Sequence, residues 1–361
     1  MALVAARKSS CRLTEKARYR FTRARDTVQC ATRRQETSLS KVWRYALYAF
    51  LLQGSSHAWA DLVAGRPIRL VVPAPPGGAP AVVGRVIAEA MGASLGHTIV
   101  VDTRPGAAGI IGARTVAQAA PDGHTVLLAT AAVMAVTPHV QRAGYDPLNA
   151  FAAVGMIQRG PYLIAVHPSL SAHSFPDLIA LAKSRPGALA YGTPGIASVH
   201  HLTWELLLAR MGASMQHIPF NGPQMVPETM AGRTQAFLNS PSAGLLQLGA
   251  SGRIRFIAQT GGRRLDAVPQ VQTLQEQGVG GFESHSWWGL VVPAGTSAAT
   301  IDALNRALNF ALDTPSVRQR LAADGVPDER FARSPTEFGG WIRAEHARYA
   351  KIVREANLQL Q

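Results

Sequence analysis

The sequence predicts an α/β protein of two similar halves, and three observations support this fold class. Strand-like apolar runs alternate with amphipathic helical stretches, which is typical of sheets covered by helices. The alternation occurs twice in the 361-residue chain, whose 47% hydrophobic content is sufficient for two cores. No Pro-rich, Ser-rich or charged linker separates the two halves. Because a linker is missing, we expect strands themselves to cross from one half to the other.

The first half predicts a βαβαβ unit. The β-branched run at 68–73 indicates a buried strand, and the spacing of apolar residues over 81–95 indicates a helix. A second strand is predicted at 98–106, where it ends in a Pro-Gly turn, followed by a helix over 109–123 and a strand at 124–130. This order predicts a parallel sheet with helices on both faces.

The second half repeats this pattern and ends in helices. Strands are expected at 162–168, 188–192, 215–220, 234–240, 253–260 and 285–296, and helices at 175–187, 197–212, 297–325 and 334–358. Two of these helices have clear start signals. Ser174 is a favourable N-cap with Asp177 three residues later, and Ser334 with Glu337 forms a capping box.

The formal net charge of +14 is concentrated at the N-terminal end. Residues 1–60 have a net charge of +9, and the remaining residues have a net charge of +5. A nucleic-acid-binding protein is expected to have a basic stripe with aromatic side chains between the charges. Outside the first 60 residues no basic run is longer than Arg263-Arg264, so we expect no nucleic-acid partner.

The N-terminal stretch 1–60 is expected to be an extension that ends in a signal peptide. Its last part has basic residues at Lys41 and Arg44, a short apolar stretch and the small-x-small sequence that ends at Ala60. We therefore expect export to the periplasm and cleavage after Ala60. A buried or interfacial helix is the alternative interpretation of this short apolar run.

Both cysteines, Cys11 and Cys30, also lie in the N-terminal stretch. The body of the chain therefore has no disulfide, no thiolate metal site and no cysteine nucleophile.

Four predicted strand-to-helix transitions are rich in small residues, at 73–80, 129–138, 191–201 and 238–244. In open α/β sheets, ligands bind at the carboxyl ends of the strands. A helix N-terminus offers unpaired N–H groups and a partial positive charge, and small residues allow close approach to the backbone. The four loops therefore favour a small anion such as a carboxylate, although tight turns without a ligand are the plain alternative for any one of them.

Several catalytic and nucleotide-binding motifs are absent or misplaced. The chain has neither a Walker phosphate loop nor a G-x-G-x-x-G dinucleotide motif. The stretch 92–96 matches G-x-S-x-G around Ser94, but it follows a helix and precedes a strand, the reverse of a nucleophile elbow. We expect a binding protein and not an enzyme, and an exported α/β hydrolase that uses Ser94 is the alternative.

Two adjacent pairs of side chains have plain structural interpretations. His200 and His201 point about 100° apart on a helix, so we expect no metal site there. Trp287 and Trp288 could form a stacking platform, but we expect them to pack between the two halves. No cofactor motif is present.

The motifs as a set resemble those of the extracytoplasmic solute receptors of tripartite tricarboxylate transporters, the Bug-type receptors. The matching stretches are RPIRLVVPAPPGG, RPGAAGIIGARTVAQAAPDGHTVLLAT, YGTPGIASVHHL, HIPFNG, WWGLVVPAGT and SPTEFGGWIRAEHARYAKIVREA, which occur in this order from Arg66 to Asn357. The resemblance implies a two-lobed periplasmic binding protein of type II, the Venus-flytrap fold, with two crossover strands. It places the first lobe at 61–162 and 286–361, and the second at 163–285.

The resemblance also implies that main-chain groups and a few hydroxyls bind the ligand carboxylates. The implied ligand-binding residues are Pro76, Gly77, Gly78, Ala79, Thr130, Thr193, Ala197, Ser198 and Asn239. The implied partners are a small organic carboxylate and the membrane subunits of a transporter, and we expect a monomer. A sensor kinase in place of the transporter is an alternative.

The chain departs from the family pattern at four positions. Ala81 stands where an acid or hydroxyl residue often follows the glycines, and Ala197 stands where a glycine is usual. Phe220 and Asn221 replace the usual Tyr and Lys. The missing acid at Ala81 argues against amino-acid ligands. The lost polar side chains predict a carboxylate that is less charged or more apolar than citrate.

Overall fold

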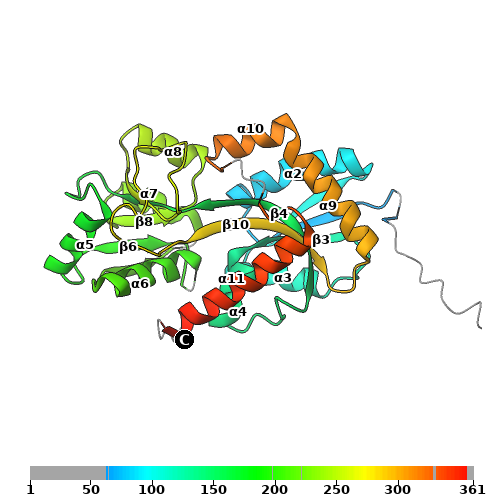
Figure 1. Cartoon of the computed structure of the whole chain (residues 1–361), viewed down its shortest axis with the longest axis horizontal. Coiled ribbons are helices and arrows are strands. Elements are labelled where there is room, and N and C mark those ends of the chain that lie inside the picture. The colour runs from blue at the N-terminus through cyan, green and yellow to red at the C-terminus, as the bar shows by residue number, and fades with distance from the viewer. Residues whose placement is uncertain (1–61, 64, 197, 221, 328–330, 356–361) are drawn as a thin grey trace, which may run out of the picture. The chain divides into compact units, whose positions relative to one another are not determined.

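The strands of the described part of the chain form two sheets of five strands each (Figure 1). The computed structural model describes residues 62–63, 65–196, 198–220, 222–327 and 331–355. All of them belong to the unit Ala60–Gln361, which is distinct from the unit Met1–Trp59. The expected signal peptide, which ends at Ala60, lies outside the described residues.

The first sheet has the strand order β2-β1-β3-β10-β4. Its strands are β1 (Ile68–Val72), β2 (Ile99–Thr103), β3 (Thr125–Thr130), β4 (Phe151–Pro161) and β10 (His285–Pro293). β1 is parallel to both β2 and β3, whereas β10 is antiparallel to β3 and β4.

The second sheet has the order β7-β6-β8-β5-β9. Its strands are β5 (Leu163–Val166), β6 (Ala190–Thr193), β7 (Gln216–Pro219), β8 (Ala236–Asn239) and β9 (Arg255–Gln259). β6 is parallel to β7 and β8, whereas β5 is antiparallel to β8 and β9. The two sheets thus have the same design.

The prediction of parallel sheets is therefore right for four strands of each sheet, which run in one direction, and wrong for one, which is β10 in the first sheet and β5 in the second. Parallel neighbours need a crossover, usually a helix, between them. β5 instead follows β4 after a single residue, and β10 enters the first sheet directly from the loop that follows β9. These direct connections produce the antiparallel pairs, and β4 and β10 are the long strands that run between the two sheets (Figure 1).

Strand β4 is the longest strand of the described residues, with eleven residues, and the sequence does not predict it. Its sequence has no regular alternation, and it contains Gly155. A Cβ at this glycine would lie 2.8 Å from the carbonyl oxygen of Arg333. The side-chain amide of Asn305 occupies the same region and donates to the carbonyls of Val154 and Arg333. A tertiary contact, invisible in the local pattern, therefore selects the glycine.

The helices cover both faces of the sheets. They are α2 (Ala79–Leu95), α3 (Ile110–Ala117), α4 (Thr137–Val140), α5 (Phe175–Ser184), α6 (Val199–Met211), α7 (Met225–Met230), α8 (Ala243–Ala250), α9 (Ala298–Asp313), α10 (Pro315–Ala323) and α11 (Pro335–Glu355), with short turns η1 (Ala107–Gly109) and η3 (Gly222–Gln224) and the π-helix η2 (Ala132–Val136). In the first sheet, Leu127 and Leu128 belong to different buried clusters, one on each face. Helices α2 and α9 pack beside each other, and α11 packs on β4 and η2.

Both predicted capping boxes are confirmed. The hydroxyl of Ser174 accepts the backbone N–H of Asp177, whose carboxylate accepts the N–H of Ser174. Ser334 and Glu337 make the same reciprocal pair at the start of α11. These helix starts are specified within four residues, which explains why the local sequence predicts them.

A threonine joins the two segments that cross between the sheets. The hydroxyl of Thr260 accepts the N–H of Tyr162 at 2.9 Å and donates to the carbonyl of Ser284 at 2.5 Å. Its backbone N–H donates to Tyr162, and its carbonyl accepts from Ser284. The crossing segments are thus fixed to each other through one buried residue.

Candidate functional site

The loop between β1 and α2 is a tight turn that exposes its backbone. The N–H of Gly78 donates to the carbonyl of Pro75 at 3.1 Å, and Gly77 has a φ of +81°. A type II turn needs glycine at this third position, with proline favoured before it, and Pro76 fills that place. Pro76 and Gly77 are exposed.

Helix α2 begins directly after this turn and leaves donors available. Within the described residues no hydrogen bond uses the N–H of Gly77 or of Ala79, the first residue of the helix. The next residue, Pro80, has no N–H. Because α2 is 17 residues long, its N-terminus carries a partial positive charge close to these two donors. The turn can therefore receive an anion without any side chain.

Ala81 lies in the first turn of α2 and is fully buried. Its methyl group belongs to the cluster between α2 and the first sheet. In this chain the position therefore faces the core and not the exposed turn, so its small size suits the packing of α2 on the sheet.

The loop between β6 and α6 is held by the side chain of Thr193. Its hydroxyl donates to the carbonyl of Gly195 at 3.1 Å and accepts the N–H of the same residue at 3.3 Å. Ser198 is the N-cap of α6 and accepts the N–H of His201 at 3.2 Å. Among the described residues no hydrogen bond uses the N–H groups of Val199 and His200, which begin the helix. Ala197, also predicted to bind ligand, lies outside the described residues.

A stack of rings lies beside Thr193. Nε2 of His217 on β7 is 2.7 Å from the Thr193 hydroxyl. The His217 ring stacks on His201 with 3.8 Å between centroids and on Tyr191 with 5.1 Å. The phenol of Tyr191 donates to the carboxylate of Glu205. Burial, and then the neighbouring His201, lowers the pKa of His217 to about 4, so the ring is neutral at pH 7.

Thr130 ends β3, and its hydroxyl accepts the N–H of Val133 at 3.4 Å. The π-helix η2 follows, and π-helical turns are frequent at functional sites. Two distant groups fix it: Tyr145 donates to the carbonyl of Val133, and Nδ1 of His346 lies 3.1 Å from the carbonyl of Met134.

Asn239 ends β8, directly opposite Leu163 of β5. Its side-chain oxygen accepts the N–H of Ser240 at 2.9 Å. The next helix, α8, is already occupied at its N-terminus, because the N–H of Ala243 donates to the carboxylate of Asp324 at 3.1 Å. One of the four predicted loops thus holds a carboxylate from the chain itself.

The structure brings the predicted residues together in two groups. Since β1 and β3 are parallel neighbours, the turn at Gly78 and Thr130 lie at the same edge of the first sheet. Since β6 and β8 are parallel neighbours, Thr193, Ser198 and Asn239 lie at the same edge of the second. His217 and Asp324 were not predicted, because both reach these loops from residues distant in the sequence.

The two tryptophans are separated by the strand. Trp287 belongs to a buried cluster that contains residues of both sheets, whereas Trp288 belongs to a cluster of the first sheet alone, so packing between the halves is wrong for Trp288 only. Trp287 contacts Phe338 edge to face at 5.7 Å and donates to Glu345. Adjacent residues of a strand point to opposite faces, which separates the two rings.

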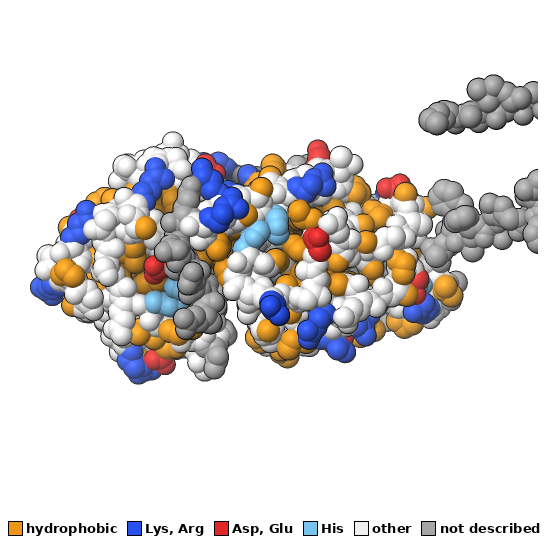
Figure 2. Space-filling model, turned by 90° about the horizontal axis from the view of Figure 1, so that it is seen from below, with side chains coloured by type: hydrophobic (Ala, Val, Ile, Leu, Met, Phe, Trp, Pro, Cys, Tyr) orange, Lys and Arg blue, Asp and Glu red, His pale blue; other side chains and the backbone are white. Residues whose placement is uncertain are grey.

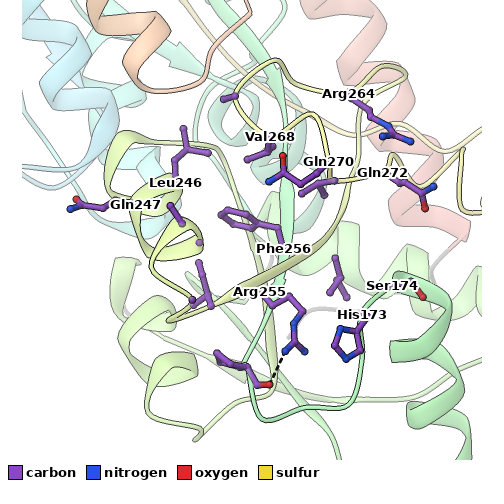
Figure 3. A pocket seen from close by; sticks show the side chains of 18 of the residues that line it. His173, Ser174, Leu246, Gln247, Arg255, Phe256, Arg264, Val268, Gln270 and Gln272 are labelled. Atoms are coloured by element: carbon purple, nitrogen blue, oxygen red, sulfur yellow. Dashed lines mark hydrogen bonds between the residues drawn. The ribbon is translucent and has the colours of Figure 1, made fainter.

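A cavity of about 770 Å³ lies elsewhere, beside the edge strand β9 (Figure 3). Its cations already have partners. Arg255 donates to three backbone carbonyls, among them those of Leu170 and Ala172, and Arg264 pairs with Glu276 at 2.8 Å. The cavity therefore offers no available cation for an anionic ligand.

Other site types find no support in the described part of the chain. It contains no group of three or more His, Cys, Asp or Glu side chains that could hold a metal ion. Ser94 lies inside α2, before β2, so it is not on a strand-to-helix turn. Lys and Arg side chains are scattered over the face seen in Figure 2. Among the described helices, none combines the length and apolar character of a membrane span.

The family model described as the tripartite tricarboxylate transporter family receptor matches residues 83–358. The chain belongs to this receptor family. Protein BugT of Bordetella pertussis is 33% identical over 309 residues, which cover 84% of this chain and 93% of BugT. The sequence resemblance to Bug-type receptors is thereby confirmed.

Solved structures show the same two-lobed periplasmic binding fold. The periplasmic binding protein BugD has a TM-score of 0.74 at 26% identity and covers 81% of this chain and 98% of its own. A Rhodopseudomonas palustris protein with adipate reaches 0.76 at 32% identity, over 82% of this chain and 99% of its own. The R. palustris protein MatC, with bound malate, reaches 0.72 at 27% identity, over 80% and 99%. The predicted fold class is confirmed for this receptor.

Proposed function

We propose that this receptor captures a small organic carboxylate in the periplasm and delivers it to a tripartite tricarboxylate-type transporter. The carrying observation is that the N-termini of α2 and α6 keep backbone N–H groups without a hydrogen-bond partner among the described residues. These are the N–H groups of Gly77 and Ala79 at α2 and of Val199 and His200 at α6. The filled N-terminus of α8 supports this assignment, because the same kind of helix start binds the carboxylate of Asp324. The N–H groups of a helix N-terminus that bind one carboxylate are suited to bind another.

In this proposal, backbone groups of Pro76, Gly77, Gly78 and Ala79 bind a carboxylate on the first lobe, at 61–162 and 286–361. The α6 loop binds on the second lobe, at 163–285, with Ser198. Thr130 and Asn239 complete the two loop groups, and Thr193 contributes by holding the α6 loop. Hinge motion at the crossing segments closes the lobes on the ligand. No bond is made or broken, so the receptor is a binding protein without catalysis. We expect it to act as a monomer.

The expected ligand has two carboxylates and an apolar spine. The apolar side chain of Ile196 is exposed beside the free amides of the α6 loop. No charged side chain is among the residues assigned to the ligand, so backbone amides provide the recognition. Adipate fits this description better than citrate, and a related structure at 32% identity contains adipate.

The test uses protein recovered from the periplasm of a bacterium that expresses the full chain. N-terminal sequencing is expected to start at Asp61, after cleavage at Ala60. Native mass spectrometry identifies co-purified small molecules, and thermal shifts are measured with adipate, malate, citrate and hexanoate. Ligand at 100 times its Kd is expected to add about 2.7 kcal/mol to the free energy of unfolding. If no carboxylate raises the melting temperature, the proposal fails.

A sensor kinase as partner makes the same binding prediction. Deletion of the receptor separates the two cases: loss of carboxylate uptake supports transport, whereas unchanged uptake with lost transcriptional induction supports sensing.

A further inference from the structure

We propose that His217 is a positioning residue for the loop between β6 and α6. It holds the loop, through the hydroxyl of Thr193, in the conformation that presents the α6 amides to a carboxylate. The role in binding rests on the proposed function, whereas the role in holding the loop does not. His217 itself lies on β7, the edge strand of the second sheet, outside the loop.

The hydrogen-bonding capacity of Thr193 is fully used. A hydroxyl has one proton to donate and two lone pairs that accept. The proton goes to the carbonyl of Gly195, because a carbonyl can only accept. One lone pair takes the N–H of Gly195, and the other faces Nε2 of His217 at 2.7 Å. Thr193 is also fully buried. It therefore has no capacity left for a ligand and acts through the loop.

All three contacts of the Thr193 hydroxyl are hydrogen bonds when its proton is directed at Gly195 and Nε2 of His217 carries a proton that it donates, and we assign this tautomer to the ring. The ring is neutral at pH 7, because burial and the adjacent His201 lower its pKa to about 4. His217 therefore contributes a directed hydrogen bond to the loop without adding a charge to the site.

The hydrogen bonds lead from His217 to the start of α6. Thr193 binds both backbone groups of Gly195, and the carbonyl of Gly195 accepts the N–H of Ser198 at 3.4 Å. Ser198 caps α6 by accepting from His201. Gly195 has a φ of +148°, which side chains disfavour, so the turn is sharp and depends on these contacts.

Two rings stack on His217. Tyr191 on β6 lies opposite it in the strand register, and His201 on α6 lies against it with 3.8 Å between centroids. Glu205 of α6 binds the phenol of Tyr191 and lies 3.9 Å from Nε2 of His201. The imidazole is thus held between a strand and the helix whose start it positions.

The experiment compares the variants His217→Phe, His217→Gln and Thr193→Val with wild type. Phenylalanine keeps an aromatic ring in the stack but has no donor. Glutamine can place an amide nitrogen near the position of Nε2, and valine keeps the buried volume of Thr193 without its hydroxyl. Amide hydrogen exchange is measured on peptides that cover residues 193–199 in ligand-free protein at pH 7, with thermal unfolding to confirm folding.

His217→Phe and Thr193→Val are each expected to speed exchange in this segment about tenfold, the effect of one lost hydrogen bond. The double variant is expected to exchange no faster than either single one, because both remove the same contact. His217→Gln is expected to restore protection. Adipate, used as the probe, is expected to bind about tenfold more weakly to the first two variants and near wild type to His217→Gln.

Wild-type exchange in His217→Phe and Thr193→Val overturns the proposal, whatever the ligand. Faster exchange with unchanged adipate affinity overturns the role in binding. If adipate does not bind wild type and no other carboxylate does, the proposed function fails. The exchange measurement, which needs no ligand, then still decides whether His217 holds the loop.

Discussion

Oδ1 of Asp324 accepts the backbone N–H of Ala243 at 3.1 Å, across 81 residues of sequence. The same carboxylate is held by the guanidinium of Arg320 in two hydrogen bonds of 3.0 Å, and Asp324 is buried. Helix α8 in the second lobe is therefore capped from the segment that follows α10. This contact satisfies a helix N-terminus with a carboxylate, which is the interaction that the α2 and α6 termini offer to a ligand.

Replacing Asp324 is expected to destabilise the protein. In Asp324→Ala, the N–H of Ala243 loses its acceptor and Arg320 loses its partner, so the free energy of unfolding falls by about 1–3 kcal/mol. Asp324→Asn keeps an oxygen for Ala243 and loses the ion pair, so its loss is expected to be smaller. Urea denaturation measures both values. Equal losses in the two variants would contradict the capping role of the oxygen.

A negative charge at Gly78 is expected to block ligand binding while preserving the fold. Gly78 is the N-cap of α2 in an extended conformation, with φ −64° and ψ 153°, and this position favours Asp and Asn equally. In Gly78→Asp the new carboxylate occupies the helix terminus and repels the ligand, so carboxylate affinity is expected to fall at least 100-fold. Isothermal titration calorimetry with adipate measures the loss.

Gly78→Asn is the matched control, because its side chain has the same size and capping ability without the charge. A Cβ here lies 3.2 Å from the carbonyl oxygen of Pro75, and this contact is shared by both variants. The asparagine variant is expected to bind better than the aspartate variant by at least tenfold. Equal affinity of the two variants would exclude a carboxylate at this turn.

The sequence predicts the features that depend on neighbouring residues. The capping boxes at Ser174 and Ser334 are specified within four residues, and the turn at Gly77 follows from proline before a glycine of positive φ. The strand-helix alternation predicts the three neighbouring parallel strands of each sheet for the same reason. These features require no knowledge of the strand order.

The missed features depend on contacts between distant residues. His217 reaches Thr193 only because β7 lies beside β6, and Asp324 reaches Ala243 only because the end of α10 meets the start of α8. Strand β4 was missed because its sequence has no regular alternation. Its Gly155 is required by the nearby carbonyl of Arg333 and the side chain of Asn305, which are distant in the sequence. The histidine in the stretch MQHIPF and the acid after α10 carry no local signal of these roles.

The crossing segments are expected to depend on the hydroxyl of Thr260. Thr260→Val leaves the N–H of Tyr162 and the carbonyl of Ser284 without this partner in a buried place, so the free energy of unfolding is expected to fall by about 2–4 kcal/mol. Thr260→Ser keeps the hydroxyl and is expected to lose less than half as much. Chemical denaturation decides, and a valine variant as stable as the serine variant would refute the role of the hydroxyl.

Stability is expected to fall between pH 6.5 and pH 4.5 because histidines are buried in their neutral forms. Burial lowers the pKa of His200 and of His217 to about 4, and it also lowers the pKa of His201 and His139. Nε2 of His200 is buried and has no hydrogen-bond partner among the described residues, so a proton there is unfavourable. In the unfolded chain these rings take up protons near pH 6.5.

The direction in which the free energy of unfolding changes with pH follows from this difference in proton binding. At pH 5 the unfolded state binds more protons than the folded state, about two more from His200 and His217 alone, so acid favours unfolding. The carboxyl groups with a lowered pKa, such as Asp177 and Glu276, also lose stability in acid, but the unfolded groups take up protons appreciably only below about pH 5.5. The decline between pH 6.5 and pH 5.5 therefore belongs to the histidines.

Urea denaturation at pH 7.0, 6.0, 5.0 and 4.5 measures this decline in wild type and in a variant that combines His200→Gln with His217→Gln. The variant lacks two of the titrating rings, so its free energy of unfolding is expected to depend less steeply on pH, whatever its stability at pH 7. A wild-type stability that stays constant or rises from pH 7.0 to 4.5 would show that these rings bind protons equally well in the folded and the unfolded chain.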